Sequence, residues 1–212
     1  MPEKYVWRTT EKEIYPTKKA PSIVTLTKQT FITIKGSGNP NSEAFGEKIT
    51  ALYAVSYAIR MAPKKNIIFP NAFDYTVYPL EGFWTLPADY HSESLDKDQL
   101  VYRIMIKQPS FVTPNVFKQA LALVKTKIKP ELFSQLNLET ITEGTVGMIL
   151  HVGSFDNEPD SFKKLTQFLD TQGYQRTSKA HKEIYLSDFR RVAEKNVKQF
   201  YVYPSLKNKN QK

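Results

Sequence analysis

The chain has 212 residues, of which 41% are hydrophobic and 24% charged, a composition typical of a globular domain. It has no cysteine, and its three histidines (His91, His151 and His181) lie far apart in the sequence. Disulfides and thiolate sites are therefore excluded, and neither a metal ion nor another cofactor is expected. The net charge of +9 comes from scattered lysines without a nucleic-acid-binding motif, which argues against nucleic acid as a partner.

The first twenty residues are charged and polar, which predicts a peripheral arm and no signal peptide, because a secretion signal needs an apolar core. No later segment reaches the roughly eighteen apolar residues of a membrane span. We therefore expect a cytoplasmic protein with no membrane partner. Residues 21–204 are predicted to form one domain, followed by a basic tail at 205–212.

The first half of this domain reads as a strand, a helix and further strands. Residues 23–36 alternate apolar and polar side chains over part of their length, as a strand does. Between Ser42 and Met61, apolar residues recur every three or four positions, which predicts an amphipathic helix that Pro63 ends. Three strand-like segments follow: NIIF at 66–69, AFDYTVYPLEGFW at 72–84 and LVYRIMIKQ at 100–108.

The second half repeats this order. A helix is predicted to begin at Thr113 and Pro114, since proline suits the first helical position. The later segments are a strand or hairpin at 139–155, a helix at 157–173 that Gly173 caps, and closing strands at 181–188 and 198–204.

The two halves also share a turn before the helix, GSGNPNS at 36–42 and GSFDNEPDS at 153–161. A duplicated strand-helix-strand-strand unit accounts best for this layout, with pseudo-repeats at about 21–109 and 110–204. The predicted fold class is α+β, with antiparallel sheets that carry helices on one face. The helix-free faces of the two units are expected to meet across a central ligand cleft.

The segment HKEIYLSD, residues 181–188, places an acid in the middle of a strand. Because strand side chains alternate, His181, Glu183 and Tyr185 share one face, opposite to Ile184. Two interpretations are open: a polar stripe that faces solvent, or the floor of a binding site. Other catalytic patterns, such as a nucleophile elbow or a phosphate-binding loop, are absent from the sequence.

Four segments together, IKGSGNPN, VYPLEGFW, MIKQPSFVTP and HKEIYLSDFRR, resemble the GyrI-like small-molecule-binding family. This family is related to the effector domains of MerR-type multidrug regulators and to gyrase-inhibitory proteins. The resemblance covers about residues 20–204, in a stand-alone form without a DNA-binding domain. It departs at Thr85 and Phe189, where the family often has tryptophan and proline.

The resemblance implies a tandem strand-helix-strand-strand fold with a cleft for bulky hydrophobic or aromatic, often cationic, small molecules. By residue match, Glu183 is the acidic anchor. Strand alternation predicts that Tyr185 lies on the same face as Glu183, and that Tyr78 and Trp84 share a face in the first half, so these three are the expected aromatic walls. The further candidates for ligand contact are Tyr57, Phe83, Tyr102, Met105, Phe111 and His181.

Two alternative functions accompany this interpretation. Some family members that look like this chain hydrolyse cyclopropane-containing alkylating toxins, which would make Glu183 a general base and Tyr185 a hydrogen-bond donor to the carbonyl. Others act as protein-interaction modules that inhibit gyrase. The sequence predicts neither an oligomeric state nor the physiological ligand.

Overall fold

The computed structural model describes residues 3–91, 94–153, 158–187 and 192–207. Strands in this part of the chain are β1 (Ser22–Leu26), β2 (Gln29–Ser37), β3 (Leu80–Thr85), β4 (Val101–Gln108), β5 (Asn137–Ile141), β6 (Gly144–Val152), β7 (Tyr174–Arg176), β8 (His181–Tyr185) and β9 (Lys198–Lys207). Helices are α1 (Trp7–Thr10), α2 (Glu43–Met61), α3 (Pro114–Val124), α4 (Pro130–Phe133) and α5 (Glu158–Thr171), with short 3-10 turns at 62–65, 97–99 and 194–196. None of the helices among these residues is long and apolar enough to span a membrane.

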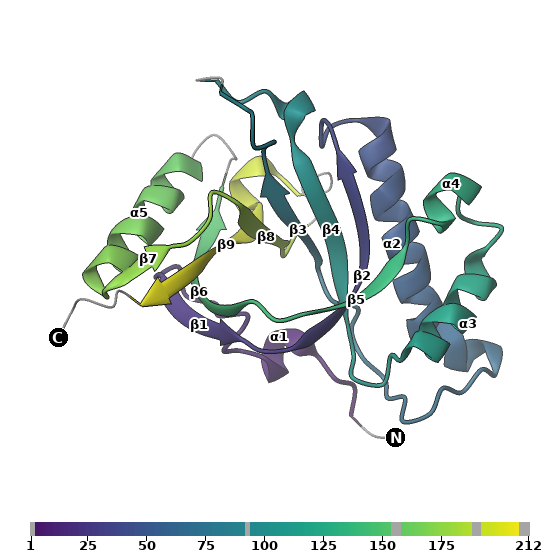
Figure 1. The fold of residues 1–212 in the computed structure, drawn as a ribbon. Helices are drawn as coiled ribbons and strands as arrows, with labels where there is room; N and C mark the ends of the chain where they lie inside the picture. Colours follow the sequence, from purple (N-terminus) through teal and green to yellow (C-terminus); the bar gives the residue numbers. More distant parts are fainter. Residues whose placement is uncertain (1–2, 92–93, 154–157, 188–191, 208–212) are drawn as a thin grey trace.

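All the strands join one antiparallel sheet, in the order β1-β6-β9-β8-β3-β4-β2-β5, with β7 added alongside β9. The central pair, β3 and β8, comes from the two halves of the chain. Short connections join β1 to β2 and β5 to β6, so the sheet curls back on itself (Figure 1). The predicted α+β class with antiparallel strands is confirmed.

The predicted helix at 42–61 is α2. Ser42 caps its start, because its hydroxyl accepts a hydrogen bond from the backbone N–H of Phe45 at 3.3 Å. The apolar residues spaced three or four apart are buried against β2 and β4: Phe45, Ile49, Leu52, Val55 and Ile59. The period of the sequence therefore predicted both the helix and its buried face.

The second long helix, α5, packs on the other half of the sheet. Leu165 and Leu169 are buried against Ile149 and Tyr201. Gly147 on β6 permits this approach, since a Cβ at that position would lie 2.7 Å from a methyl carbon of Leu169. The helix thus depends on a strand position without a side chain.

Both long helices lie on the same face of the sheet and leave β3 and β8 between them (Figure 1). This differs from the expected arrangement of two helix-free faces across a cleft, because one sheet continues through both halves. The concave, helix-free face is instead filled by buried apolar side chains, among them Met148, Ile184, Phe200 and Val202.

Three local expectations are corrected by strand pairing. Residues 66–69 form no strand: Asn66 has a φ of 59°, and Ile68 is 86% exposed. Of residues 72–84, only those from Leu80 onward belong to a strand. Of the segment predicted as a strand or hairpin, residues up to 153 are described: they contain strands and no hairpin, because β5 pairs with β2 and β6 pairs with β1 and β9. Gly144, the first residue of β6, has a left-handed backbone with a φ of 72°.

The N-terminal segment, which we expected to be a peripheral arm, packs onto the body of the protein. Trp7 and Tyr15 are buried, and their rings lie 4.6 Å apart. The indole N–H of Trp7 donates to the carbonyl of Val77 at 3.0 Å. This segment therefore covers part of the fold, although the sequence shows no extended apolar pattern there.

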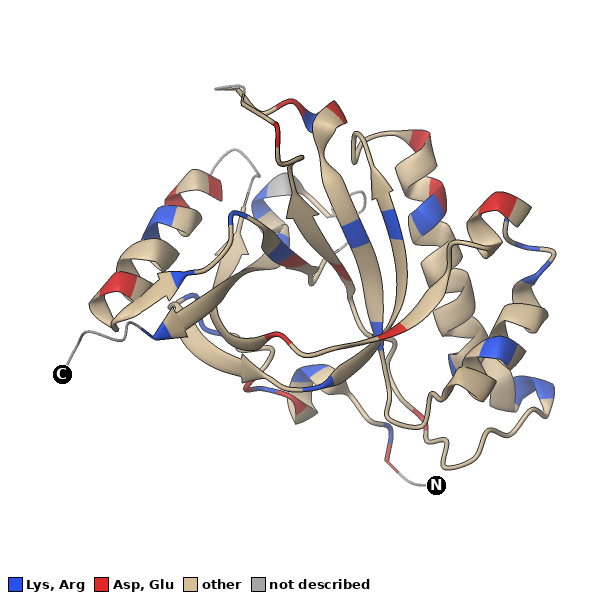
Figure 2. Ribbon diagram, in the orientation of Figure 1, with Lys and Arg blue, Asp and Glu red and all other residues tan. Residues whose placement is uncertain are grey.

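An ion cluster is buried within the curled sheet. Lys182 Nζ lies 2.9 Å from Glu81 Oε2 and 2.5 Å from Glu143 Oε1, and all three side chains are buried. Other basic residues are distributed over helices and strands (Figure 2). The cluster joins β3 and β8 to the connection between β5 and β6.

Candidate functional site

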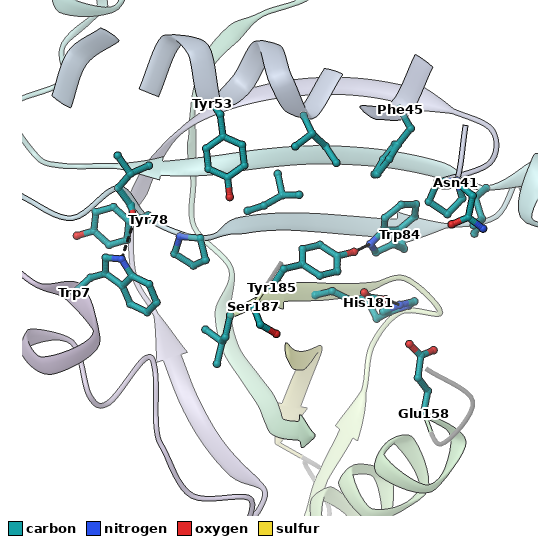
Figure 3. A pocket seen from close by; sticks show the side chains of 18 of the residues that line it. Trp7, Asn41, Phe45, Tyr53, Tyr78, Trp84, Glu158, His181, Tyr185 and Ser187 are labelled. Atoms are coloured by element: carbon teal, nitrogen blue, oxygen red, sulfur yellow. Dashed lines mark hydrogen bonds and ion pairs between the residues drawn. The ribbon is translucent and has the colours of Figure 1, made fainter. Parts of the chain in front are cut away.

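A cavity of about 630 Å³ lies on the helical face of the sheet, over β3 and β8. Side chains from α2, from the start of α5 and from the N-terminal segment complete its walls (Figure 3). The turn at Pro40 and Asn41, part of the repeated GSGNPNS motif, borders it as well. The site thus draws on segments from both halves of the chain.

The floor of the cavity is built by the pairing of β3 with β8. Gly82 is the cross-strand partner of Glu183, and Trp84 is the partner of His181. Partners in an antiparallel pair point to the same face, so these side chains meet at the cavity. Gly82 leaves room for them, because a Cβ there would lie 2.8 Å from the indole nitrogen of Trp84.

The polar face of β8 turns toward this cavity. His181, Glu183 and Tyr185 all line it, as strand alternation predicted for a shared face. Glu183 is only 9% exposed, which favours the binding-site interpretation over a solvent-facing stripe. Its Oε1 lies 2.9 Å from Nε2 of His181.

Tyr185 is held in place by a hydrogen bond from the neighbouring strand β3. The indole N–H of Trp84 donates to its hydroxyl oxygen at 3.0 Å. Burial raises the pKa of Tyr185 well above its usual value, and the neighbouring Glu183 carboxylate adds to the rise. The phenol therefore keeps its proton and is a hydrogen-bond donor in the cavity.

A second carboxylate in the cavity, Glu158, was missed by the sequence reasoning. It begins α5, and the amide of Gln199 donates to its Oε1 at 3.3 Å. Burial raises the pKa of Glu158, and the negative charge of Glu183 contributes to the rise. The repeated turn could have pointed to this residue. Glu158 lies in the second copy, GSFDNEPDS, and the first copy, GSGNPNS, also borders the cavity.

Aromatic rings form the remaining walls. Phe45 and Trp84 pack with ring centroids 5.7 Å apart, and Trp7 stacks with Tyr78 at 6.2 Å with an interplanar angle of 18°. Figure 3 shows Trp7 and Tyr78 at one end of the cavity, and Trp84 toward the end where Glu158 lies. Tyr53 and Tyr57 line the cavity from α2.

Four predicted contact residues are not brought to the cavity. Phe83 and Met105 lie on the opposite face of the sheet, where Phe83 packs against the cationic groups of Arg103 and Lys182. Tyr102 lies in the core, with its ring 5.4 Å from that of Trp84. Phe111 packs 5.9 Å from Tyr75, away from the site.

The predicted residues that do line the cavity come from three elements and one loop: Tyr57, Tyr78, Trp84, His181, Glu183 and Tyr185. In the described part of the chain, no three histidine or carboxylate side chains gather as they would around a metal ion. The arrangement offers two carboxylates, a protonated phenol and aromatic faces, a set suited to a cationic or hydrogen-bond-donating organic molecule.

Comparisons with known proteins agree with this geometry. Residues 19–204 match the family described as GyrI-like small molecule binding domain. The structure resembles that of a hydrolase from Listeria innocua, with 28% identity, a TM-score of 0.85, and coverage of 96% of this chain and 100% of that one. Another structure from this organism, described as an uncharacterized conserved protein, is 29% identical with a TM-score of 0.87 and the same coverage.

A more distant likeness shows the fold alone. The C-terminal domain of EcmrR, a MerR-type regulator, is 12% identical with a TM-score of 0.50, over 88% of this chain and 97% of that domain. A comparison with curated proteins gave no match. From the family match over most of its length, the chain belongs to the GyrI-like small-molecule-binding domains.

Proposed function

We propose that this protein binds bulky hydrophobic or aromatic, often cationic, small molecules, as a multidrug-binding or toxin-binding protein, with Glu183 as the electrostatic anchor. The observation that carries the proposal is a carboxylate, 9% exposed, at the floor of an aromatic cavity. Attraction between opposite charges grows as water is excluded. Aromatic faces add cation–π attraction.

The size of the cavity supports a ligand of this kind. A volume of about 630 Å³ falls within the range of sites for drug-sized molecules. Its two carboxylates lie on β8 and at the start of α5, whereas Phe45, Trp84 and Tyr78 supply flat apolar surface. The cationic side chains that line it, Arg8 and Lys97, come from other segments. The flat apolar surface accepts ligands of varied shape, while the carboxylates favour positive charge.

Dye binding tests the anchor. We expect Glu183→Gln to weaken rhodamine 6G binding about tenfold or more, since an interaction with a charged partner contributes roughly 1.5–3 kcal/mol. The neutral dye Nile red should bind both proteins alike. Fluorescence anisotropy measures both affinities, and Glu131→Gln, an exposed site on α4, is the matched control for charge.

Two results would overturn the proposal. Equal rhodamine affinity in wild type and Glu183→Gln would remove the anchor role. No binding of either dye by the wild-type protein would remove the binding function itself.

A hydrolase is the second candidate, favoured by the likeness at 28% identity to structures described as hydrolases. For a cyclopropane conjugated to a carbonyl, Glu183 would take a proton from water as its oxygen bonds to a ring carbon. The ring C–C bond would break, and its electron pair would pass to the carbonyl oxygen, to which the Tyr185 phenol donates a hydrogen bond. The proton that Glu183 took from water would then pass to that oxygen, which leaves both residues in their starting state.

Mass spectrometry separates the two candidates. A catalyst adds the mass of one water to a cyclopropane-containing alkylating toxin, and both Glu183→Gln and Tyr185→Phe should abolish this product. Product formation at the rate of buffer alone would exclude the hydrolase and leave the binding function.

A further inference from the structure

The N-terminal segment lies outside the family match at 19–204, yet it supplies one end of the cavity. Trp7 lines this end and is 3% exposed. Arg8 lines it too, with its guanidinium 4.7 Å from the ring centroid of Trp7. The family match alone would not have included this wall.

Main-chain hydrogen bonds hold the segment against the loop before β3. The N–H of Tyr5 donates to the carbonyl of Asp74 at 2.8 Å, and the N–H of Thr76 donates to the carbonyl of Tyr5 at 2.9 Å. Arg8 donates to the carbonyl of Leu186, just after β8, at 2.6 Å. The segment thus spans from the β3 side of the site to the β8 side.

One buried carboxylate, Glu11, connects the segment to the walls of the cavity. Its Oε1 accepts hydrogen bonds from the hydroxyls of Tyr5 at 2.8 Å and Tyr78 at 2.5 Å. Its Oε2 lies 2.5 Å from Nζ of Lys107, and both charged side chains are largely buried. Burial and the Glu11 carboxylate raise the pKa of Tyr78, so its phenol remains a donor. Partly buried charge-assisted bonds of this kind are stronger than those in water.

We propose that Trp7 is a specificity-determining wall of the ligand cavity and that Glu11 is the positioning residue that holds it there. The ligands this wall selects are elongated aromatic cations, long enough to reach from the carboxylates at one end to Trp7 at the other. This inference rests on the proposed binding function.

The fluorescence of tryptophan can test the position of Trp7. The chain has two tryptophans, Trp7 and Trp84, and both line the cavity, toward opposite ends (Figure 3). In a Trp84→Phe background, Trp7 is the single indole. Its burial predicts weak quenching by acrylamide. Glu11→Ala should raise the quenching constant about threefold or more, because Trp7 loses its fixed position, whereas Glu13→Ala, an exposed site two residues away, should leave it unchanged.

This first measurement needs no ligand. An unchanged quenching constant in Glu11→Ala, with circular dichroism confirming that each variant is folded, would overturn the positioning role of Glu11. A rise in both variants alike would overturn it too, because the effect would then not be specific to the buried carboxylate.

Ligand length tests the wall itself. Trp7→Ala should weaken rhodamine 6G binding about five- to tenfold, which corresponds to the loss of about 1.0–1.4 kcal/mol of aromatic contact. The short cation benzyltrimethylammonium, which can reach the carboxylates without reaching Trp7, should bind within about twofold of wild type. Isothermal titration calorimetry measures both.

The outcomes separate the wall from the binding function. Equal losses for both cations, or no loss for rhodamine, would overturn the wall, whereas a weaker rhodamine affinity in Glu183→Gln would still support the binding function. If the wild-type protein bound neither cation, the binding function and the wall would both be overturned, and the quenching experiment would still decide the role of Glu11.

Discussion

Lys182 shows how one buried cation can hold strands together at the scale of a single residue. Burial alone would lower the pKa of Lys182, but the carboxylates of Glu81 and Glu143 outweigh it, and its pKa is raised. Burial raises the pKa of Glu81, and Lys182 opposes this rise. The lysine is therefore charged, and its positive charge compensates the negative charge of its two carboxylate partners.

Replacing Lys182 by methionine should lower the free energy of unfolding by about 3–5 kcal/mol, because a buried ion cluster that loses one partner keeps an uncompensated charge. Urea unfolding measures this change. Lys118→Met, on the exposed side of α3, is the control and should stay within about 0.5 kcal/mol of wild type.

A rescue variant sharpens this test. Adding Glu81→Gln and Glu143→Gln to Lys182→Met removes the orphaned charges and should recover part of the lost stability. A Lys182→Met protein as stable as wild type would contradict the role given to the cluster.

At the scale of elements, the periodicity of apolar residues predicted the helices and the faces of strands, because these depend on residues close together in the sequence. The period of apolar residues predicted α2 and α5, and alternation predicted the cavity-facing side of β8. The pairing of strands could not be predicted, because β3 and β8 are about a hundred residues apart in the chain. For the same reason, the sequence placed Met105 at the site, whereas pairing with Glu81 puts it on the opposite face.

Two glycines with opposite surroundings test the packing of the long helices. Gly46 lies inside α2 with nothing near its missing Cβ, so Gly46→Ala should raise the free energy of unfolding by about 0.5–1 kcal/mol. Gly147→Ala should lower it by about 1–3 kcal/mol, because its Cβ would meet Leu169 of α5. Denaturant midpoints measure both, and stability changes of the same sign would refute the packing account.

At the scale of the whole molecule, burial raises the pKa of many tyrosine phenols. The pKa of seven of the twelve tyrosines is raised, chiefly by burial: Tyr5, Tyr15, Tyr75, Tyr78, Tyr185, Tyr201 and Tyr203. In the unfolded chain a tyrosine loses its proton near pH 10. The folded protein keeps these protons to higher pH.

Stability should therefore fall as the pH rises above about 10, because the unfolded state then binds fewer protons than the folded state. Below that pH the contribution is fully present. Urea unfolding at pH 8 to 11 measures the fall, and tyrosinate absorbance should rise together with loss of structure. Full ionisation of all tyrosines in a protein that stays folded would contradict this prediction.

The continuous sheet limits how a ligand can enter. A hinge motion that separated the two halves would have to break the backbone hydrogen bonds between β3 and β8. These strands pair from Leu80 with Tyr185 to Trp84 with His181. Because of this pairing, the floor of the cavity is a continuous part of the sheet. We therefore expect a ligand to enter and bind without separation of the two halves of the sheet.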